Sequence, residues 1–130
     1  MSRYRILVLI LWAMTLAGCD GLLEPNDKGL IEIRLIEKRW TDGVELARST
    51  AKIQLSPLVA NLQAVKRDLD SLPVSKCLNL AKMAFGVHMS FTIDAFFLFM
   101  RDDKYSAQDK LEKAKVFLES YESYRDKCST

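Results

Sequence analysis

The sequence predicts an all-α fold, a single four-helix up-and-down bundle over residues 29–130. Three observations predict it. Glycine and proline are scarce after residue 29, apolar residues recur at steps of three or four, and no repeat or low-complexity tract divides the chain. Four segments of this kind are joined by short connections, which favours antiparallel neighbours around one shared core.

The first two predicted helices each carry one apolar stripe. The stripe of the first helix consists of Ile33, Ile36, Trp40, Val44, Ala47 and Ala51. The second helix is expected to begin with Ser56 as its N-cap and Pro57 at its first helical position, a pairing that is typical of helix starts. Its stripe consists of Leu58, Leu62, Val65, Leu69 and Leu72.

The third predicted helix, residues 75–101, is apolar on nearly all sides, with Ser75 as its N-cap. Such a helix is either the buried centre of a bundle or a membrane span. Lys82, His88 and Asp94 interrupt the apolar sequence, and an ionised Asp near mid-bilayer costs about 2.5–3.5 kcal/mol on insertion scales. We therefore expect the centre of the bundle, because the other amphipathic helices need an apolar partner.

The fourth predicted helix, residues 106–127, follows a turn made by Asp102 and Asp103. Its inner face is expected to carry Leu111, Ala114, Phe117 or Leu118, Tyr121 and Tyr124. Two charged stretches, residues 32–38 and 104–115, mix positive and negative side chains. Such alternation is typical of a solvated helix surface rather than of a site.

The N-terminal segment has the features of an export signal. Arg3 and Arg5 precede an apolar run over residues 6–16, which ends in Leu16-Ala17-Gly18-Cys19. This ending resembles the lipobox of bacterial lipoproteins. The resemblance implies that signal peptidase II removes residues 1–18 and that Cys19 carries fatty acyl chains such as palmitate. The composition of the following residues, which include Pro25, Asn26 and Asp27, predicts that residues 19–28 form the lipidated N-terminus and a short tether. The alternative is an ordinary secreted protein with a cysteine near its cleavage site.

A lipidated Cys19 would anchor the chain to a cell membrane, facing the periplasm or the cell exterior. Asp20 favours the inner membrane under the sorting rule of enteric lipoproteins. The sequence holds 19 Lys and Arg against 17 Asp and Glu, and the excess equals Arg3 and Arg5. The mature chain is therefore formally neutral and lacks the basic surface typical of nucleic-acid binding, so no nucleic-acid partner is expected.

The other two cysteines, Cys77 and Cys128, are predicted to form a disulfide. Cys77 lies at the start of the third helix and Cys128 at the end of the fourth. Antiparallel neighbours of similar length bring these two ends together, and an envelope compartment is oxidising. The alternative is a redox-active or metal-binding thiol pair, but no Cys-x-x-Cys spacing occurs.

His88 is the only histidine, and no hydrolase, zinc-protease or phosphate-loop motif surrounds it. We interpret it as a core or boundary residue of the bundle. The alternative is a soft copper site made with Met83 and Met89, although methionine also fills gaps in apolar cores. The sequence thus predicts no catalytic residue, no metal site and no cofactor.

Asp94 lies in the most apolar helix, where a carboxylate needs a cation, donors or a proton. One interpretation is a buried ion pair with a cation of a neighbouring helix. The candidate cations are Arg39, Arg48, Lys66 and Arg67. The other interpretation is a ligand contact, with Trp40 and the nearby polar residues Arg39, Asp42 and Glu45 at the same mouth. For Trp40, a plain core position is the simpler interpretation.

Segments from residue 39 to residue 96 resemble a helical region of uncharacterised bacterial envelope proteins. The segments that carry the resemblance are residues 39–43, 46–50, 61–68, 72–74 and 92–96. The resemblance implies a helical, extracytoplasmic domain and carries over no site residue. We expect a non-enzymatic interaction module that binds another envelope protein. The alternative is a carrier or sensor of a small apolar ligand held near Asp94 and the cluster at residues 96–99, and an enzyme ranks third.

Overall fold

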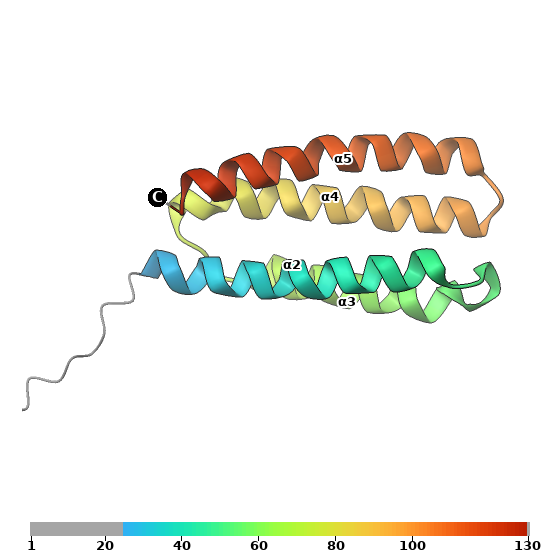
Figure 1. The fold of residues 1–130 in the computed structure, drawn as a ribbon, viewed down its shortest axis with the longest axis horizontal. Helices are drawn as coiled ribbons and strands as arrows, with labels where there is room; N and C mark the ends of the chain where they lie inside the picture. The colour runs from blue at the N-terminus through green and yellow to red at the C-terminus, as the bar shows by residue number, and fades with distance from the viewer. Residues whose placement is uncertain (1–24, 130) are drawn as a thin grey trace, which may run out of the picture.

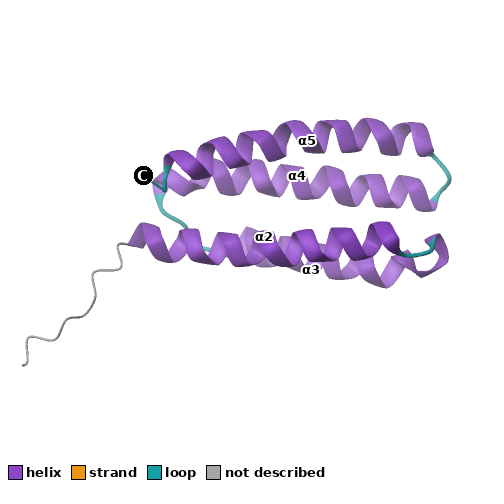
Figure 2. Cartoon of the chain, viewed as in Figure 1, coloured by secondary structure: helices purple, strands orange, loops and turns teal. Residues whose placement is uncertain are grey.

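A computed structural model describes residues 25–129 of the chain. These residues form four α-helices, one short 3-10 helix and no strand (Figures 1 and 2). The elements are α2 (Pro25–Ser49), η1 (Lys52–Gln54), α3 (Leu55–Ser71), α4 (Lys76–Met100) and α5 (Lys104–Lys127). The chain reverses direction at every connection, so the predicted all-α, up-and-down bundle is confirmed (Figure 1).

The helices form two pairs, α2 with α3 and α4 with α5 (Figure 1). The pairs are joined mainly where α3 packs on α4. Alanines are prominent among the buried residues of α4 and α5, and small side chains let two helix backbones approach closely. These alanines are Ala81, Ala84, Ala95, Ala107 and Ala114.

The hydrophobic core follows the predicted stripes with small shifts. In α2, Ile33, Ile36, Trp40 and Ala47 are buried, whereas Ala51 lies outside the helix and is exposed. The buried residues of α3 are Leu55, Val59, Leu62, Val65 and Leu69. The predicted stripe of α3 is therefore confirmed: Leu62, Val65 and Leu69 are buried, and Leu58 and Leu72 at its ends are partly buried and pack against the core.

Two helix starts differ in how well the sequence predicted them. Ser75 caps α4 as expected, because its side chain accepts a hydrogen bond from the backbone N–H of Leu78. Ser56 does not cap α3, since η1 leads directly into a helix that begins at Leu55. Pro57 instead occupies the first turn of α3, where a missing N–H costs no helical hydrogen bond.

Helix α5 begins two residues earlier than predicted. Asp103 is its N-cap and accepts a hydrogen bond from the backbone N–H of Ser106 at 3.0 Å. Helix α2 begins at Pro25, so residues 25–28, expected in the tether, are helical. The expectations for the signal peptide, Cys19 and Asp20 concern residues that lie outside those described.

The predicted disulfide is confirmed. Cys77 at the start of α4 and Cys128 after the end of α5 are bonded, with their Cα atoms 5.8 Å apart. The bond fixes the register of the α4–α5 pair at the end of the bundle where α2 begins (Figure 1). It also confirms that these two helices are antiparallel neighbours.

Helix α4 is less enclosed than a central helix was expected to be. Leu80, Met83, Val87 and Phe97 are exposed, although the opposite side of α4 contributes Phe85 and Met89 to the core. Within the part of the chain described, α4 is also the one helix long and apolar enough to cross a membrane, a test that core helices pass as well. It packs here between α3 and α5.

Candidate functional site

Two hollows lie along the seam between α2 and α5. Both are lined by residues of α2, α4 and α5, and Arg48 belongs to both. The first, which we call the central hollow, is lined by Trp40, Val44, His88, Leu118 and Glu122 among others. The second, which we call the distal cavity, lies at the end of the bundle farthest from Pro25 (Figure 1).

Trp40 and His88 form a hydrogen bond inside the central hollow. The indole N–H of Trp40 donates to Nε2 of His88 at 3.1 Å, and Nδ1 of His88 lies 2.8 Å from the backbone oxygen of Ala114. An indole nitrogen only donates and a carbonyl oxygen only accepts. The imidazole must therefore be neutral, with its proton on Nδ1. One residue from each of α2, α4 and α5 takes part in this bridge, which we call the imidazole bridge.

The surroundings of His88 keep it neutral. Burial lowers the pKa of its imidazole, an effect opposed by the hydrogen bond to Ala114 and reinforced by the positive charge of Arg48. The ring stacks on Phe85, with centroids 5.9 Å apart and planes 8° apart. The interpretation of His88 as a boundary residue of the bundle is thus supported by its position, and its ring is a structural link between three helices.

A second polar link joins α2 to α5 closer to the disulfide. The hydroxyl of Tyr121 donates to Oε2 of Glu37 at 2.8 Å, and the guanidinium of Arg125 donates to both oxygens of Glu37 at 3.0 and 3.1 Å. Tyr121 is fully buried and stacks on Phe85 with centroids 4.4 Å apart. Burial and the neighbouring carboxylate raise the pKa of Tyr121, so the hydroxyl remains protonated and donates.

Sequence reasoning missed this contact of Glu37 with Tyr121 and Arg125. Glu37 was expected on a solvated charged face, yet it accepts bonds from residues 84 and 88 positions away. Charge alternation describes partners on the same helix and does not reveal a partner on a distant one. The available signal was Tyr121 itself, because a tyrosine predicted on the inner face of a helix needs a partner for its hydroxyl.

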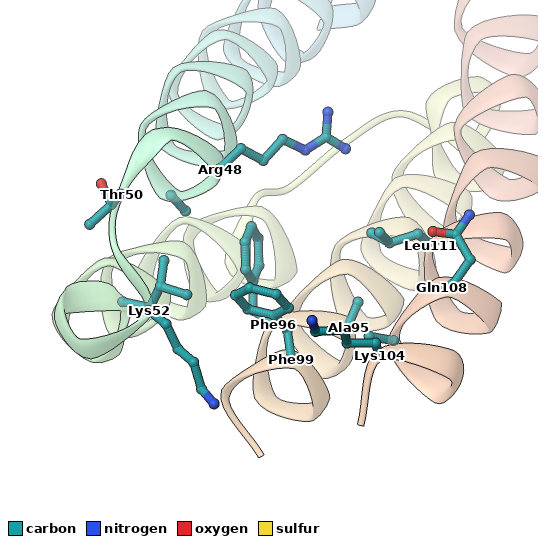
Figure 3. A pocket seen from close by; sticks show the side chains of 12 residues that line it. Arg48, Thr50, Lys52, Ala95, Phe96, Phe99, Lys104, Gln108 and Leu111 are labelled. Atoms are coloured by element: carbon teal, nitrogen blue, oxygen red, sulfur yellow. The ribbon is translucent and has the colours of Figure 1, made fainter. Parts of the chain in front are cut away.

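The distal cavity has a volume of about 400 Å³ and an apolar floor. Leu55, Ala95, Phe96, Phe99 and Leu111 supply the apolar surface, and Figure 3 shows the two phenylalanines between the α2 side and the α5 side. Polar side chains surround this apolar surface. They are Arg48, Thr50, Lys52, Lys104 and Gln108.

The positive charges of the distal cavity differ in their pairing. Lys52 forms a salt bridge with Asp102 in the turn between α4 and α5. Arg48 and Lys104 form no salt bridge or side-chain hydrogen bond with any other residue in the described part of the chain. The cavity lining contains no Asp or Glu. The opening is therefore an apolar surface bordered by three cations: Lys52 is paired with Asp102, Lys104 is close enough to Asp102 to lower its pKa, and Arg48 forms no salt bridge among the described residues.

The structure places Asp94 away from this cavity. Its side chain is 52% exposed, and its carboxylate lies 3.6 Å from the ammonium of Lys110 on α5. The predicted buried pair was wrong, and two of the expected cations have other partners, Arg39 with Asp68 and Lys66 with Asp70. The residues after Asp94 are divided between two faces. Phe96 and Phe99 line the distal cavity, whereas Asp94 and Phe97 line a shallow surface hollow.

Only some of the residues expected to form a ligand-binding opening around Trp40 lie together. Trp40 is buried, as a core position requires, and Glu45 lines the same hollow. Arg39 and Asp42 instead pair with Asp68 and Lys38.

The three side chains considered as copper ligands do not point to a common site. Met83 is exposed on the outer face of α4 and Met89 is fully buried in the core, while both ring nitrogens of His88 are bound to Trp40 and Ala114. Among the residues that the structure describes, no three His, Cys, Asp or Glu side chains are grouped so as to hold a metal ion.

Comparison of the chain with protein-family models, with curated proteins and with solved structures gives no match.

Proposed function

We propose that this chain is a membrane-anchored bacterial lipoprotein that acts as a non-enzymatic interaction module of the cell envelope. In this proposal Cys19 carries the lipid, the bundle stands in the periplasm or at the cell exterior, and another envelope protein binds the bundle. The observation that supports binding of a protein partner is the outer face of α4.

That outer face carries three large apolar side chains that are exposed to solvent. Leu80, Met83 and Val87 are exposed by 54%, 59% and 36%, and they follow one another at steps of three and four. Such spacing puts three large apolar side chains on one stripe of the helix. Contiguous exposed apolar surface of this kind is typical of sites where a partner binds.

A photo-crosslinking amino acid at position 83 tests this surface in the full chain in living cells. We expect a discrete crosslinked adduct, and we expect it to disappear when Val87→Glu is added, because a carboxylate on the stripe must be desolvated at the interface. The matched control places the crosslinker at exposed Arg67 on α3. Equal adducts from positions 67 and 83, or an adduct that survives Val87→Glu, would count against a binding site on α4.

The anchor is tested separately. Cys19→Ala removes the thiol that would form the thioether with the lipid, so we expect an unprocessed precursor that incorporates no labelled palmitate. Asp20→Asn is the control and should still be processed. Normal maturation of the Cys19→Ala chain would overturn the lipoprotein proposal.

Support for a non-enzymatic role comes from the imidazole bridge. The lone pair on Nε2 of His88 accepts from Trp40, and Nδ1 is bound to Ala114. The one histidine of the chain is thus held away from the role of a general base, which needs a free nitrogen within reach of a substrate proton.

A second candidate function is supported by the distal cavity. We infer that the bundle could instead carry or sense a small apolar ligand, because about 400 Å³ of space lies over Phe96 and Phe99, within the size range of ligand sites. Native mass spectrometry of the full chain released from membranes should then show a bound small molecule. Gln108→Trp, which adds bulk at an exposed position of the cavity lining, should abolish it, and a wild-type chain that carries no additional mass would contradict this candidate.

A further inference from the structure

We propose that the distal cavity binds a single-chain amphiphile with an anionic head, such as a long-chain carboxylate. This inference rests on the second candidate function and names its ligand class. The chain of the amphiphile would lie on the apolar floor made by Phe96, Phe99 and Leu111. Its head would lie between Arg48 of α2 and Lys104 of α5.

The lining favours an anion over a neutral ligand. Arg48 and Lys104 come from helices on opposite sides of the opening, and each lacks a salt bridge among the described residues. Figure 3 shows the side chain of Arg48 extending across the opening towards the α5 side. Both side chains are exposed, so their charged ends are accessible to a ligand, and a guanidinium binds a carboxylate or phosphate through two parallel hydrogen bonds.

The rest of the lining is consistent with a charged head and an apolar tail. No Asp or Glu lines the cavity, so nothing in the lining would repel an anion. Gln108 and Thr50 add hydrogen-bonding groups beside the two cations. Lys52 is already neutralised by Asp102, which leaves Arg48 and Lys104 as the residues that select the head.

The cavity lies at the end of the bundle opposite the start of α2. It involves Ala47 near the end of that helix, whereas the helix begins at Pro25, and at 1.5 Å per residue this separation is about 30 Å.

Photoaffinity labelling of the full chain in isolated membranes tests the inference. Three probes share one diazirine-bearing sixteen-carbon chain and differ in the head, which is a carboxylate, a phosphate or an uncharged alcohol. We expect the anionic probes to label the peptides that contain Phe96, Phe99 and Leu111 at least tenfold more than the alcohol does. The double variant Arg48→Ala/Lys104→Ala should remove that preference.

The matched control is Arg67→Ala/Lys115→Ala, which removes two exposed cations outside the cavity and should label like wild type. Protease resistance compared among the variants shows that each keeps its fold.

The outcomes separate this inference from the function on which it rests. Stronger labelling by the carboxylate or by the phosphate identifies which anionic head is preferred, and either result supports the inference. Equal labelling of the cavity by all three probes, unchanged in Arg48→Ala/Lys104→Ala, would refute the anionic ligand and leave an apolar ligand in place. Labelling by no probe, or only at Leu80 and Met83 on the outer face of α4, would overturn both.

Discussion

The imidazole bridge predicts that the bundle loses stability as the pH falls below neutrality. Protonation of His88 would place a second N–H opposite the indole N–H of Trp40, at a nitrogen–nitrogen distance now 3.1 Å. The pKa of His88 is lowered in the fold from 6.5, mainly by burial. The unfolded chain therefore binds a proton more readily than the folded chain, and stability present above pH 6.5 is lost as the pH falls towards the folded pKa.

The size of this loss of stability follows from the linkage between proton binding and folding. For one group with an unfolded pKa of 6.5 that stays unprotonated in the fold, the free energy of unfolding falls by at most about 1.4 kcal/mol between pH 7.5 and 5.5. With a urea dependence of about 1–3 kcal/mol per M, which is typical of small proteins, this loss corresponds to a fall in the midpoint of unfolding of about 0.5–1.4 M. Urea titrations of the disulfide-intact chain, followed by circular dichroism, measure this shift.

The choice of pH range isolates one residue. His88 is the only histidine in the sequence, and no other side chain has an ordinary pKa between 5 and 8. The charged groups that act on the imidazole are Arg48, which lowers the pKa of His88, and Glu122, which raises it.

His88→Gln is the matched control, because an amide can accept from Trp40 and donate to Ala114 without titrating. It should give equal midpoints at pH 5.5 and 7.5. A wild-type midpoint that does not move, or the same slope in His88→Gln, would refute the assignment of a buried neutral imidazole.

Three further predictions concern other parts of the bundle. Tyr121→Phe should lower the free energy of unfolding by about 1.5–3 kcal/mol in the same urea assay, because it removes a hydrogen bond to the charged carboxylate of Glu37, and an unchanged midpoint would contradict that bond. Asp94→Asn should change stability by less than about 1 kcal/mol, as expected for an exposed ion pair, so a larger loss would restore the buried-pair interpretation. Reduction of the Cys77–Cys128 bond, which closes a loop of 51 residues, should cost about 4 kcal/mol in the chain-entropy model, and thiol titration of the unfolded, unreduced chain should find neither cysteine free.

The elements that could be predicted are those set by local periodicity. The stripes of α2 and α3 have one apolar face each, so a period of 3.6 residues is enough to predict both the helices and most of their buried residues. The disulfide followed from the same level of reasoning, because Cys77 and Cys128 lie at ends that meet when two helices of similar length run antiparallel.

The environment of Asp94 could not be predicted in this way. When a helix is apolar on nearly all sides, periodicity does not say which side meets a neighbour and which meets water. In α4 the side that carries Asp94 and Phe97 is exposed, and the side that carries Phe85 and Met89 is buried. That rotation is set by the packing of α3 and α5 against α4, which depends on contacts between helices rather than on the sequence of one of them.

The failed N-cap at Ser56 has a different physical cause. Ser-Pro is a favourable helix start in isolation, but the chain already turns through η1, so α3 begins at Leu55. Leu55 is almost completely buried. Its burial in the core favours an early helix start over the capping bond of an exposed serine.

The seam between α2 and α5 explains why the candidate ligand site lies at one end of the bundle. Near the disulfide, long side chains fill the space between the two helices and bind each other, as in the contact of Glu37 with Tyr121 and Arg125. Towards the other end Arg48 of α2 and Lys104 and Gln108 of α5 line the opening, and two cations cannot pair with one another. Among the described residues no hydrogen bond joins α2 to α5 at that end, so the opening remains there, and that is where we propose that an anionic head binds.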